Sequence, residues 1–261
     1  MTVRHAAGSP NWFELGTTDP ASAETFYAGL FGWEPVHSAM PDGGTYTIFR
    51  LDGREAAAAY PLKAEQRAQG MPSSWGVYFQ VDDADAAAEA VVAAGGRVHV
   101  PPFEVMQHLR MAVCADPEGA MFMVGQPRQH PGVGAIREPN AVCWAELATR
   151  DLDRADAFYT TVLRWTMQAH HASPPDTYRI FGNADGMLGG LLRITPEWGD
   201  IPSHWAIYLQ VEDVDAVVER AQALGGRLVF PAFDAPQVGR IARIEDPTGA
   251  GFYVIRFVKP A

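Results

Sequence analysis

The stretch that decides the fold is PNWFELGTTDPASAETFYAGLFGWEP, residues 10–35, because the chain repeats it. Residues 139–167 read PNAVCWAELATRDLDRADAFYTTVLRWTM and restore the same residue types 132 positions later. The identical pairs are Trp12 and Trp144, Glu14 and Glu146, Leu15 and Leu147, Thr17 and Thr149, Asp19 and Asp151, Phe26 and Phe158, Tyr27 and Tyr159, and Trp33 and Trp165. Self-similarity at a fixed spacing indicates a duplicated structural unit.

A second repeat follows the first in each half of the chain. Residues 75–98 match residues 205–228 at a spacing of 130, and the turn sequence Asp-Pro-x-Gly at 116–119 returns at 246–249. The chain therefore has two halves of similar length.

The Pro- and Gly-rich stretch between the halves is the predicted linker. We place it at residues 129–139, between a first domain at 1–128 and a second domain at 140–261.

Each half is built from two smaller units, each with one strand, one helix and three further strands. The segment WFELGTT alternates apolar and polar residues as a half-buried strand does. Asp19 and Pro20 then form a favourable helix start, and Gly32 ends the helix. Residues 44–51 and 54–60 have the composition of further strands. The sequence predicts an α+β fold of four βαβββ modules.

Composition narrows the classes of partner. Hydrophobic residues make up 48% of the chain, which is typical of a globular protein, and 31 acidic against 20 basic residues give a net charge of −11. Because such a charge repels phosphate backbones and anionic lipids, we expect neither a nucleic acid nor a membrane partner. We find no apolar targeting segment and expect a cytoplasmic protein, a monomer or homodimer. Two cysteines, Cys114 and Cys143, are too few for a disulfide framework.

These motifs resemble the vicinal oxygen chelate superfamily, which includes glyoxalases, bleomycin-resistance proteins and dioxygenases. The resemblance rests on the strand–Asp–helix block ending in FYAGLFGW, the V-x-D-x-D-A helix start, the Gly-Gly helix stop and the DPxG turn, and it covers nearly the whole chain. It implies modules paired into two cup-shaped half-barrels that each hold a ligand. The pairing could follow chain order, or join the first module with the fourth and the second with the third.

The resemblance also implies where a catalytic metal would be held. Metal-binding relatives place His, Glu or Gln on the first strand of a module and on the last strand. The residues at the aligned positions here are Trp12, Gly76, Met123, Trp144, Ala206 and Tyr253. Because these are not ligands for a divalent cation, we expect no metal and no cofactor.

Strand alternation predicts which side chains line the cups. The expected ligand-binding residues are Trp12, Glu14, Tyr46, Tyr78, Gln80, His108, Met121, Met123, Trp144, Glu146, Tyr178, His204, Tyr208, Gln210 and Tyr253. Such a lining is apolar, contains few polar groups and suits a planar aromatic ligand. The alternative is that Trp12 and Trp144 fill the cups as ordinary core residues.

Glu14 and Glu146 need a separate explanation, because a carboxylate on an inner strand face is costly unless it is paired. They could anchor a ligand or act as a general base, or they could form salt bridges to an arginine such as Arg50 or Arg179. Arg110 and Arg240, at matched positions before the DPxG turn, are interpreted as structural.

The leading hypothesis is a metal-free binding protein of the bleomycin-resistance type, which sequesters a hydrophobic, aromatic small molecule or natural product. The alternative is a glyoxalase-like lyase or isomerase, or a hydroxylase-type tailoring enzyme. Such an enzyme would use Glu14 or Glu146 as its base, or a metal if the aligned positions are misplaced. A third hypothesis is a protein-interaction role through a sheet edge.

Overall fold

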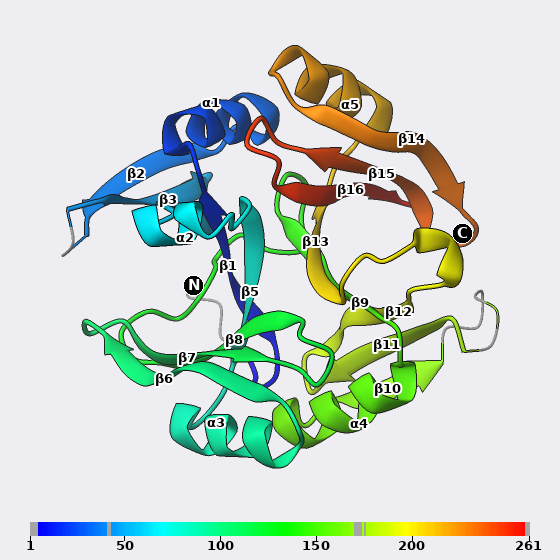
Figure 1. Ribbon diagram of the computed structural model, residues 1–261. Helices are drawn as coiled ribbons and strands as arrows, with labels where there is room; N and C mark the ends of the chain where they lie inside the picture. Colours follow the sequence, from blue (N-terminus) through cyan, green and yellow to red (C-terminus); the bar gives the residue numbers. More distant parts are fainter. Residues whose placement is uncertain (1–4, 41–42, 170–173, 175, 259–261) are drawn as a thin grey trace. The chain divides into compact units, whose positions relative to one another are not determined.

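The computed structural model describes residues 5–40, 43–169, 174 and 176–258, and it contains four βαβββ modules (Figure 1). The first consists of β1 (Pro10–Thr17), α1 (Pro20–Phe31), β2 (Glu34–Ala39), β3 (Thr45–Leu51) and β4 (Arg54–Pro61). After the short helix α2 (Ala64–Ala68), the second consists of β5 (Ser74–Gln80), α3 (Ala84–Ala93), β6 (Arg97–Val105), β7 (Leu109–Ala115) and β8 (Met121–Pro127).

The third and fourth modules repeat this order. The third consists of β9 (Val142–Thr149), α4 (Leu152–Leu163), β10 (Thr166–Ala169), β11 (Tyr178–Asn183) and β12 (Gly186–Arg193). After the 3-10 helix η1 (Pro196–Trp198), the fourth consists of β13 (His204–Gln210), α5 (Val214–Ala223), β14 (Arg227–Ala235), β15 (Gly239–Glu245) and β16 (Gly251–Phe257). The predicted α+β class and the module order are confirmed.

The strands form two eight-stranded sheets with the same order. The orders are β2-β3-β4-β1-β5-β8-β7-β6 and β10-β11-β12-β9-β13-β16-β15-β14. Within each module the first strand pairs in parallel with the last, as β1 does with β4 and β5 with β8. Each sheet therefore combines two modules in chain order, one of the two pairings that the sequence left open.

Local sequence explains why each module begins as it does. β1 is buried along its whole length except at half-buried Glu14, so the half-buried strand predicted from the apolar–polar alternation is wrong. The sheet covers Trp12 on one face, while Phe13 and Leu15 are buried on the other. The Asp19 carboxylate then accepts a hydrogen bond from the Ser22 amide and caps α1. Gly32 ends the helix at a φ of 72°, a left-handed conformation that glycine adopts without steric cost. No helix in the described part of the chain is long and apolar enough to cross a membrane.

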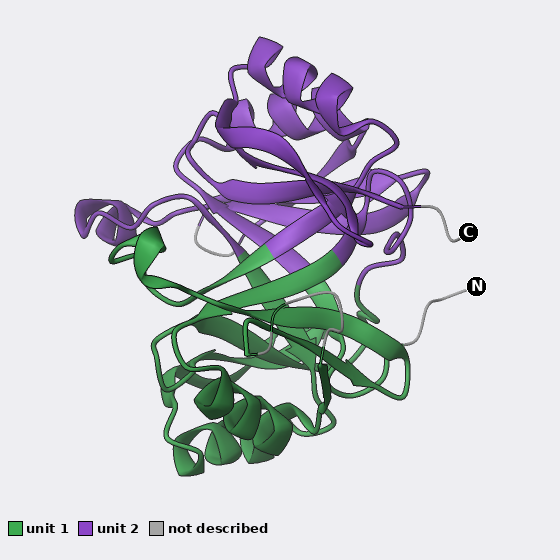
Figure 2. Ribbon diagram, turned by 90° about the vertical axis from the view of Figure 1, so that its right-hand side faces the viewer, with its two compact units in different colours: residues 1–12, 76–132, 144–206 green, residues 13–75, 133–143, 207–261 purple. Residues whose placement is uncertain are grey.

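The chain divides into two compact units that combine modules from both halves of the sequence (Figure 2). Unit 1 comprises residues 1–12, 76–132 and 144–206, and therefore holds most of the second and third modules. Unit 2 comprises residues 13–75, 133–143 and 207–261, with most of the first and fourth modules. The second pairing that the sequence left open is thus the one found within the compact units.

A buried hydrogen-bond chain in unit 2 joins the first and fourth modules to Trp75, the second residue of β5. Trp75 donates from Nε1 to the Tyr27 hydroxyl at 2.9 Å, and that hydroxyl donates to the Asp246 carboxylate at 3.1 Å. Tyr27 lies on α1 and Asp246 begins the DPxG turn before β16, so residues 219 positions apart meet in the core. Phe26 and Phe252 pack edge to face beside them, with ring centroids 6.2 Å apart.

Unit 1 contains the same chain at the repeated positions. Trp205 donates to the Tyr159 hydroxyl at 3.0 Å, and Tyr159 donates to the Asp116 carboxylate at 3.1 Å. Burial, and then the charge of Asp116, raises the pKa of Tyr159 well above its usual value. The tyrosine therefore stays protonated and can keep donating.

Replacing Tyr159 by Phe should lower the free energy of unfolding by about 1–3 kcal/mol, because the buried Trp205 N–H and the Asp116 carboxylate lose a partner. Denaturant unfolding of the variant measures this loss. Thr161→Ala, on the exposed face of the same helix, is the control and should change stability by less than about 0.5 kcal/mol. Equal losses for the two variants would contradict the structural role of Tyr159.

Candidate functional site

A row of four directly paired residues crosses the sheet face of the fourth module. Phe230 pairs with Arg243, Arg243 with Tyr253, and Tyr253 with Tyr208. Because directly paired residues share a face, the four side chains lie side by side, and we call them the aromatic row. The rings of Tyr208 and Tyr253 stack with centroids 4.4 Å apart and planes 8° apart. The Arg243 guanidinium carbon lies 5.9 Å from the Tyr253 centroid, a cation–π contact.

The second module has the corresponding row with different chemistry. Its members, in the same strand order, are Val100, Val113, Met123 and Tyr78. The register therefore brings together Tyr78 and Met123, both of which we expected on this face. Tyr208 and Tyr253 meet in the same way in the fourth module. The row of the fourth module therefore has three aromatic side chains and one arginine, whereas the row of the second module has two valines, one methionine and one tyrosine.

In the first module a tyrosine holds the expected carboxylate. The Tyr46 hydroxyl donates to Glu14 Oε1 at 2.5 Å, so Tyr46 joins Glu14 as predicted. Glu14 is half-buried and lies opposite Ala58 on β4. Burial, and then the negative charge of Glu14, raises the pKa of the nearby Tyr60 to about 12. The Glu14 carboxylate thus accepts a hydrogen bond from Tyr46 and lies near Tyr60, whose raised pKa keeps it protonated.

The third module extends this pair to three residues. Trp144 Nε1 donates to the Tyr178 hydroxyl at 2.9 Å, and Tyr178 donates to Glu146 Oε2 at 2.8 Å. Glu146 is buried, with 6% of its surface exposed, so it is less accessible than Glu14. Burial, and then the charge of Glu146, raises the pKa of Tyr178 well above its usual value.

A glycine makes this arrangement possible. Gly190 lies opposite Glu146, and a Cβ built on it would lie 1.9 Å from the Tyr178 hydroxyl. Tyr178 therefore lies directly on the backbone of β12. The matching residue of the first module is Ala58, whose Cβ occupies that space. The absence of a side chain at Gly190 thus lets Tyr178 cover Glu146 within the third module.

The salt bridges considered for the two glutamates are made elsewhere. Arg179 bonds to Asp153 and, at 2.8 Å, to Asp156. Arg50 lies 3.8 Å from Glu55. The ion-pair alternative is wrong for both arginines. For Arg179 the reason is geometric, since it follows Tyr178 on the strand and so points to the opposite face, towards α4.

Trp12 has an aromatic partner that strand alternation does not predict. Its ring meets His130 edge to face with centroids 4.5 Å apart, and His130 lies 6.3 Å from the ring of His108. His130 falls in the predicted linker, where no strand periodicity marks a direction for its side chain. His108 itself is exposed, as a loop histidine usually is.

The other expected residues have varied surroundings. Gln80 accepts a hydrogen bond from Asn11 at 3.1 Å. Met121 is 44% exposed on β8. His204 Nδ1 lies 2.9 Å from the Pro202 carbonyl oxygen. The backbone amide of Gln210 donates to Ala141 at 3.0 Å. Ligand binding by these residues stays a prediction.

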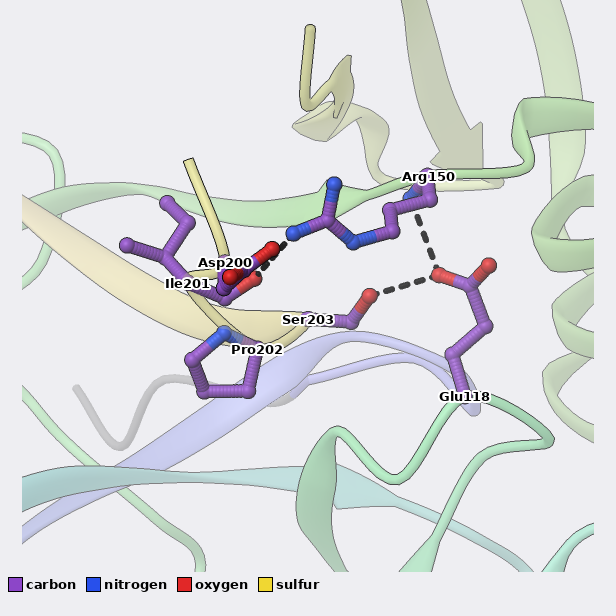
Figure 3. Close-up of a pocket in the computed structure, with 6 residues that line it drawn as sticks. All are labelled: Glu118, Arg150, Asp200, Ile201, Pro202 and Ser203. Carbon is purple, nitrogen blue, oxygen red and sulfur yellow. Dashed lines mark hydrogen bonds between the residues drawn. The ribbon is translucent and has the colours of Figure 1, made fainter. Parts of the chain in front are cut away.

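An open pocket of about 420 Å³ lies elsewhere in unit 1 (Figure 3). Its lining is Glu118, Arg150, Asp200, Ile201, Pro202 and Ser203. The Glu118 carboxylate accepts from Thr149 at 2.7 Å, Ser203 at 2.6 Å and the Arg150 amide at 2.9 Å. The Arg150 guanidinium donates to two loop carbonyls at 2.8 Å. The Glu118 carboxylate and the Arg150 guanidinium therefore stabilise the loops around the pocket through these hydrogen bonds.

Glu118→Gln should reduce stability at neutral pH, with a difference from wild type that shrinks in acid. Burial alone would raise the pKa of this carboxyl, but hydrogen bonds from Ser203, Thr149 and Arg150 together lower it from its usual value of 4.5. A lowered pKa stabilises the folded state above about pH 4.5, and that contribution is lost as pH falls through the folded-state value. Urea unfolding between about pH 3 and pH 7 measures the difference, with Glu89→Gln as an exposed control. A difference that does not vary with pH would contradict the assignment.

Gly190→Ala should destabilise the protein by about 1–3 kcal/mol, because the new methyl group collides with Tyr178. The measurement is a double-mutant cycle with Tyr178→Ser, which removes the ring. The cost of Gly190→Ala should largely disappear in that background. A cost that persists unchanged would mean that Gly190 is needed for a reason other than the tyrosine.

The residues present do not fit the divalent metal that the resemblance implies. Such a cation needs several imidazole, carboxylate or thiolate ligands around one point. In residues 5–40, 43–169, 174 and 176–258, no three His, Cys, Asp or Glu side chains form such a group. At the aligned last-strand positions the register instead pairs Met123 with Tyr78 and Tyr253 with Tyr208.

Comparisons with known proteins agree with this fold. Residues 9–124 and 141–254 each match the model of the Glyoxalase/Bleomycin resistance protein/Dioxygenase superfamily. The chain is 37% identical over 250 residues to a "Putative glyoxylase CFP32" of Mycobacterium tuberculosis, covering 95% of each chain. It is also 37% identical over 263 residues to the "Anthracycline biosynthesis protein DnrV" of Streptomyces peucetius, covering 97% of this chain and 94% of that protein.

Solved structures show the same architecture at low identity. The Mn(II)-bound glyoxalase from Novosphingobium aromaticivorans aligns with a TM-score of 0.67 at 16% identity, covering 97% of this chain and 83% of that one. The 2,3-dioxygenase LapB from Pseudomonas sp. KL28 aligns with the same TM-score at 12% identity, covering 99% and 96%. With two family matches that span most of its length, the chain belongs to the glyoxalase/bleomycin resistance protein/dioxygenase superfamily as a tandem, two-domain member.

Proposed function

We propose that this protein binds a planar, hydrophobic aromatic small molecule and does so without a metal. The observation that carries the proposal is the aromatic row of the fourth module. Where metal-binding relatives need a ligand on the last strand, Tyr253 stacks on Tyr208 at 4.4 Å. Tyr208 and Tyr253 are themselves buried, with 7% and 8% of their surface exposed, so a ligand would meet the row at half-buried Phe230 and Arg243 and at exposed Phe233. An aromatic surface of this kind favours a flat apolar ligand.

Two features support the proposal that these sheet faces bind a ligand and are not simply closed hydrophobic cores. Glu14 with Tyr46 supplies a half-buried carboxylate and a hydroxyl. Phe233, which continues the aromatic surface 6.0 Å from Phe230, is 44% exposed. Small-molecule sites commonly combine an apolar surface with a few such polar groups.

The names of two relatives favour the same class of ligand. DnrV and the DauV protein of Streptomyces sp. strain C5, each 37% identical to this chain, are described as anthracycline biosynthesis proteins. Anthracyclines contain fused planar rings. A role in binding an aromatic natural product, for sequestration or resistance, therefore fits both the relatives and the aromatic row.

A metal-free tailoring enzyme is the second candidate, and the partial exposure of Glu14 favours it. A general base must reach its substrate, and Glu146 is enclosed by Tyr178 and Trp144. Glu14 is therefore the candidate base if the bound molecule is converted. Chromatography of the ligand recovered after incubation separates the two functions, because a binding protein returns the ligand unchanged.

The test is a fluorescence titration of chelator-treated, dialysed protein with 9-anthracenemethanol and 1,8-dihydroxyanthraquinone. We expect saturable binding of both compounds, and binding of 9-anthracenemethanol, which does not chelate metals, should not change when zinc, nickel, iron or manganese is restored. Tyr253→Met, which installs the residue of the matching Met123 position, should weaken binding about threefold to tenfold through loss of the stack.

Trp198→Ala, in the partly exposed helix η1, is the control and should bind as wild type does. Binding that appears only with a restored metal, or no binding of either compound, would overturn the proposal.

A further inference from the structure

Arg243 differs from the other arginines of its module in what it contacts. It lies on β15 between Phe230 and Tyr253, within the aromatic row, and is half-buried. Its guanidinium carbon lies 5.9 Å from the Tyr253 centroid.

Glu245 lies on the same face of β15, since a Cβ built on Gly251 would lie 3.4 Å from Arg243 Nη2 and 3.9 Å from Glu245 Cγ. The Glu245 carboxylate, however, pairs with Arg227. Burial thus removes part of the hydration of Arg243, and the carboxylate beside it is already engaged by another arginine.

Its neighbour Arg240 shows the structural use of an arginine on the same strand. Arg240 binds both oxygens of Asp215 at 2.7 Å and lies 3.3 Å from Asp234. Arg110 repeats the bidentate contact with Asp85 at 2.7 Å in the first half of the chain. These two arginines therefore belong to the repeated fold, as the sequence analysis interpreted them.

Arg243 is not part of that repeat. The matching residue of the second module is Val113, which sits between Val100 and Met123 in the same strand register. Because the second module forms the same strands with valine there, the fold does not require an arginine at this position. The positive charge therefore needs a different explanation.

We propose that Arg243 binds the anionic group of the ligand, and that the ligand is an aromatic carboxylate whose rings lie along the aromatic row. This inference rests on the proposed function and names the class of ligand. Arginine presents a planar fork of donors that matches a carboxylate, and it can keep its contact with Tyr253 while doing so. The exposed edge of Phe233 provides apolar surface for the rings beside that anchor.

The experiment compares two probes of nearly the same shape, 9-anthracenecarboxylate and neutral 9-anthracenemethanol. The wild-type protein should bind the carboxylate about tenfold more tightly, a typical gain for one charge-assisted hydrogen-bonded pair. Raising the salt concentration should weaken carboxylate binding and leave alcohol binding unchanged.

Variants assign that preference to one residue. Arg243→Met should remove the preference by weakening carboxylate binding, whereas Arg243→Lys should retain part of it. Arg256→Met is the matched control, because Arg256 is exposed on β16 and, three residues after Tyr253, lies on the opposite face of that strand. Thermal unfolding confirms that each variant is folded.

Two results would overturn the inference alone. One is equal affinity of the wild-type protein for the two probes, and the other is an equal loss of both probes in Arg243→Met. In either case the proposed function stands, because planar molecules still bind. If neither probe binds the wild-type protein, the proposed function fails and the inference fails with it.

Discussion

Two buried hydrogen-bond chains, Trp75–Tyr27–Asp246 and Trp205–Tyr159–Asp116, hold together modules that are far apart in the sequence, and the packing of each compact unit depends on them. In each hydrogen-bond chain the aspartate also stabilises its own DPxG turn, because one of its carboxylate oxygens accepts hydrogen bonds from backbone amides of that turn. In unit 1 these amides are those of Glu118 and Ala120, both at 2.9 Å. One carboxylate thus shapes a turn and holds a tyrosine from a different module, which explains why the DPxG turn and the Phe-Tyr pair are repeated together.

These hydrogen-bond chains lie on the helix side of the sheets. The residues on the opposite sheet face can therefore differ between the two halves of the chain. Phe79 and Phe122 are fully buried on the helix side, while the face positions beside them form the Val100–Val113–Met123–Tyr78 row. The fourth module keeps the same register with the aromatic row in its place. A fold stabilised from one side can change the chemistry of its other side without losing its packing.

The sequence predicted the features that depend on near neighbours. Strand alternation, the Asp19 cap and the Gly32 stop each act within a few residues, so the sequence was enough to locate the modules. The pairing of modules could not be predicted, because it depends on contacts such as that between Tyr27 and Asp246, 219 positions apart. The true pattern combines both candidate pairings, one in the sheets and the other in the compact units.

The candidate site was predicted in part, for related reasons. Glu14 and Tyr46 were expected on one face, and the structure adds the hydrogen bond between them. Phe230 and its partner Arg243 were not predicted, because register shifts between Leu228 and Phe233 disturb the two-residue period of β14.

Because the chain is duplicated, each residue can be compared with the residue at the matching position of the other half. Residues needed for packing are expected in both halves, whereas a residue that binds a ligand can occur in one half alone. Arg110 and Arg240 occur in both halves with the same bidentate partner, so their role is to fasten a helix start to a sheet. Arg243 occurs in one half, where its contact is an aromatic ring. The second module forms the same strands with Val113 at this position, so the fold does not depend on the charge of Arg243. The simplest physical reason to retain it is a counter-charge that arrives with the ligand.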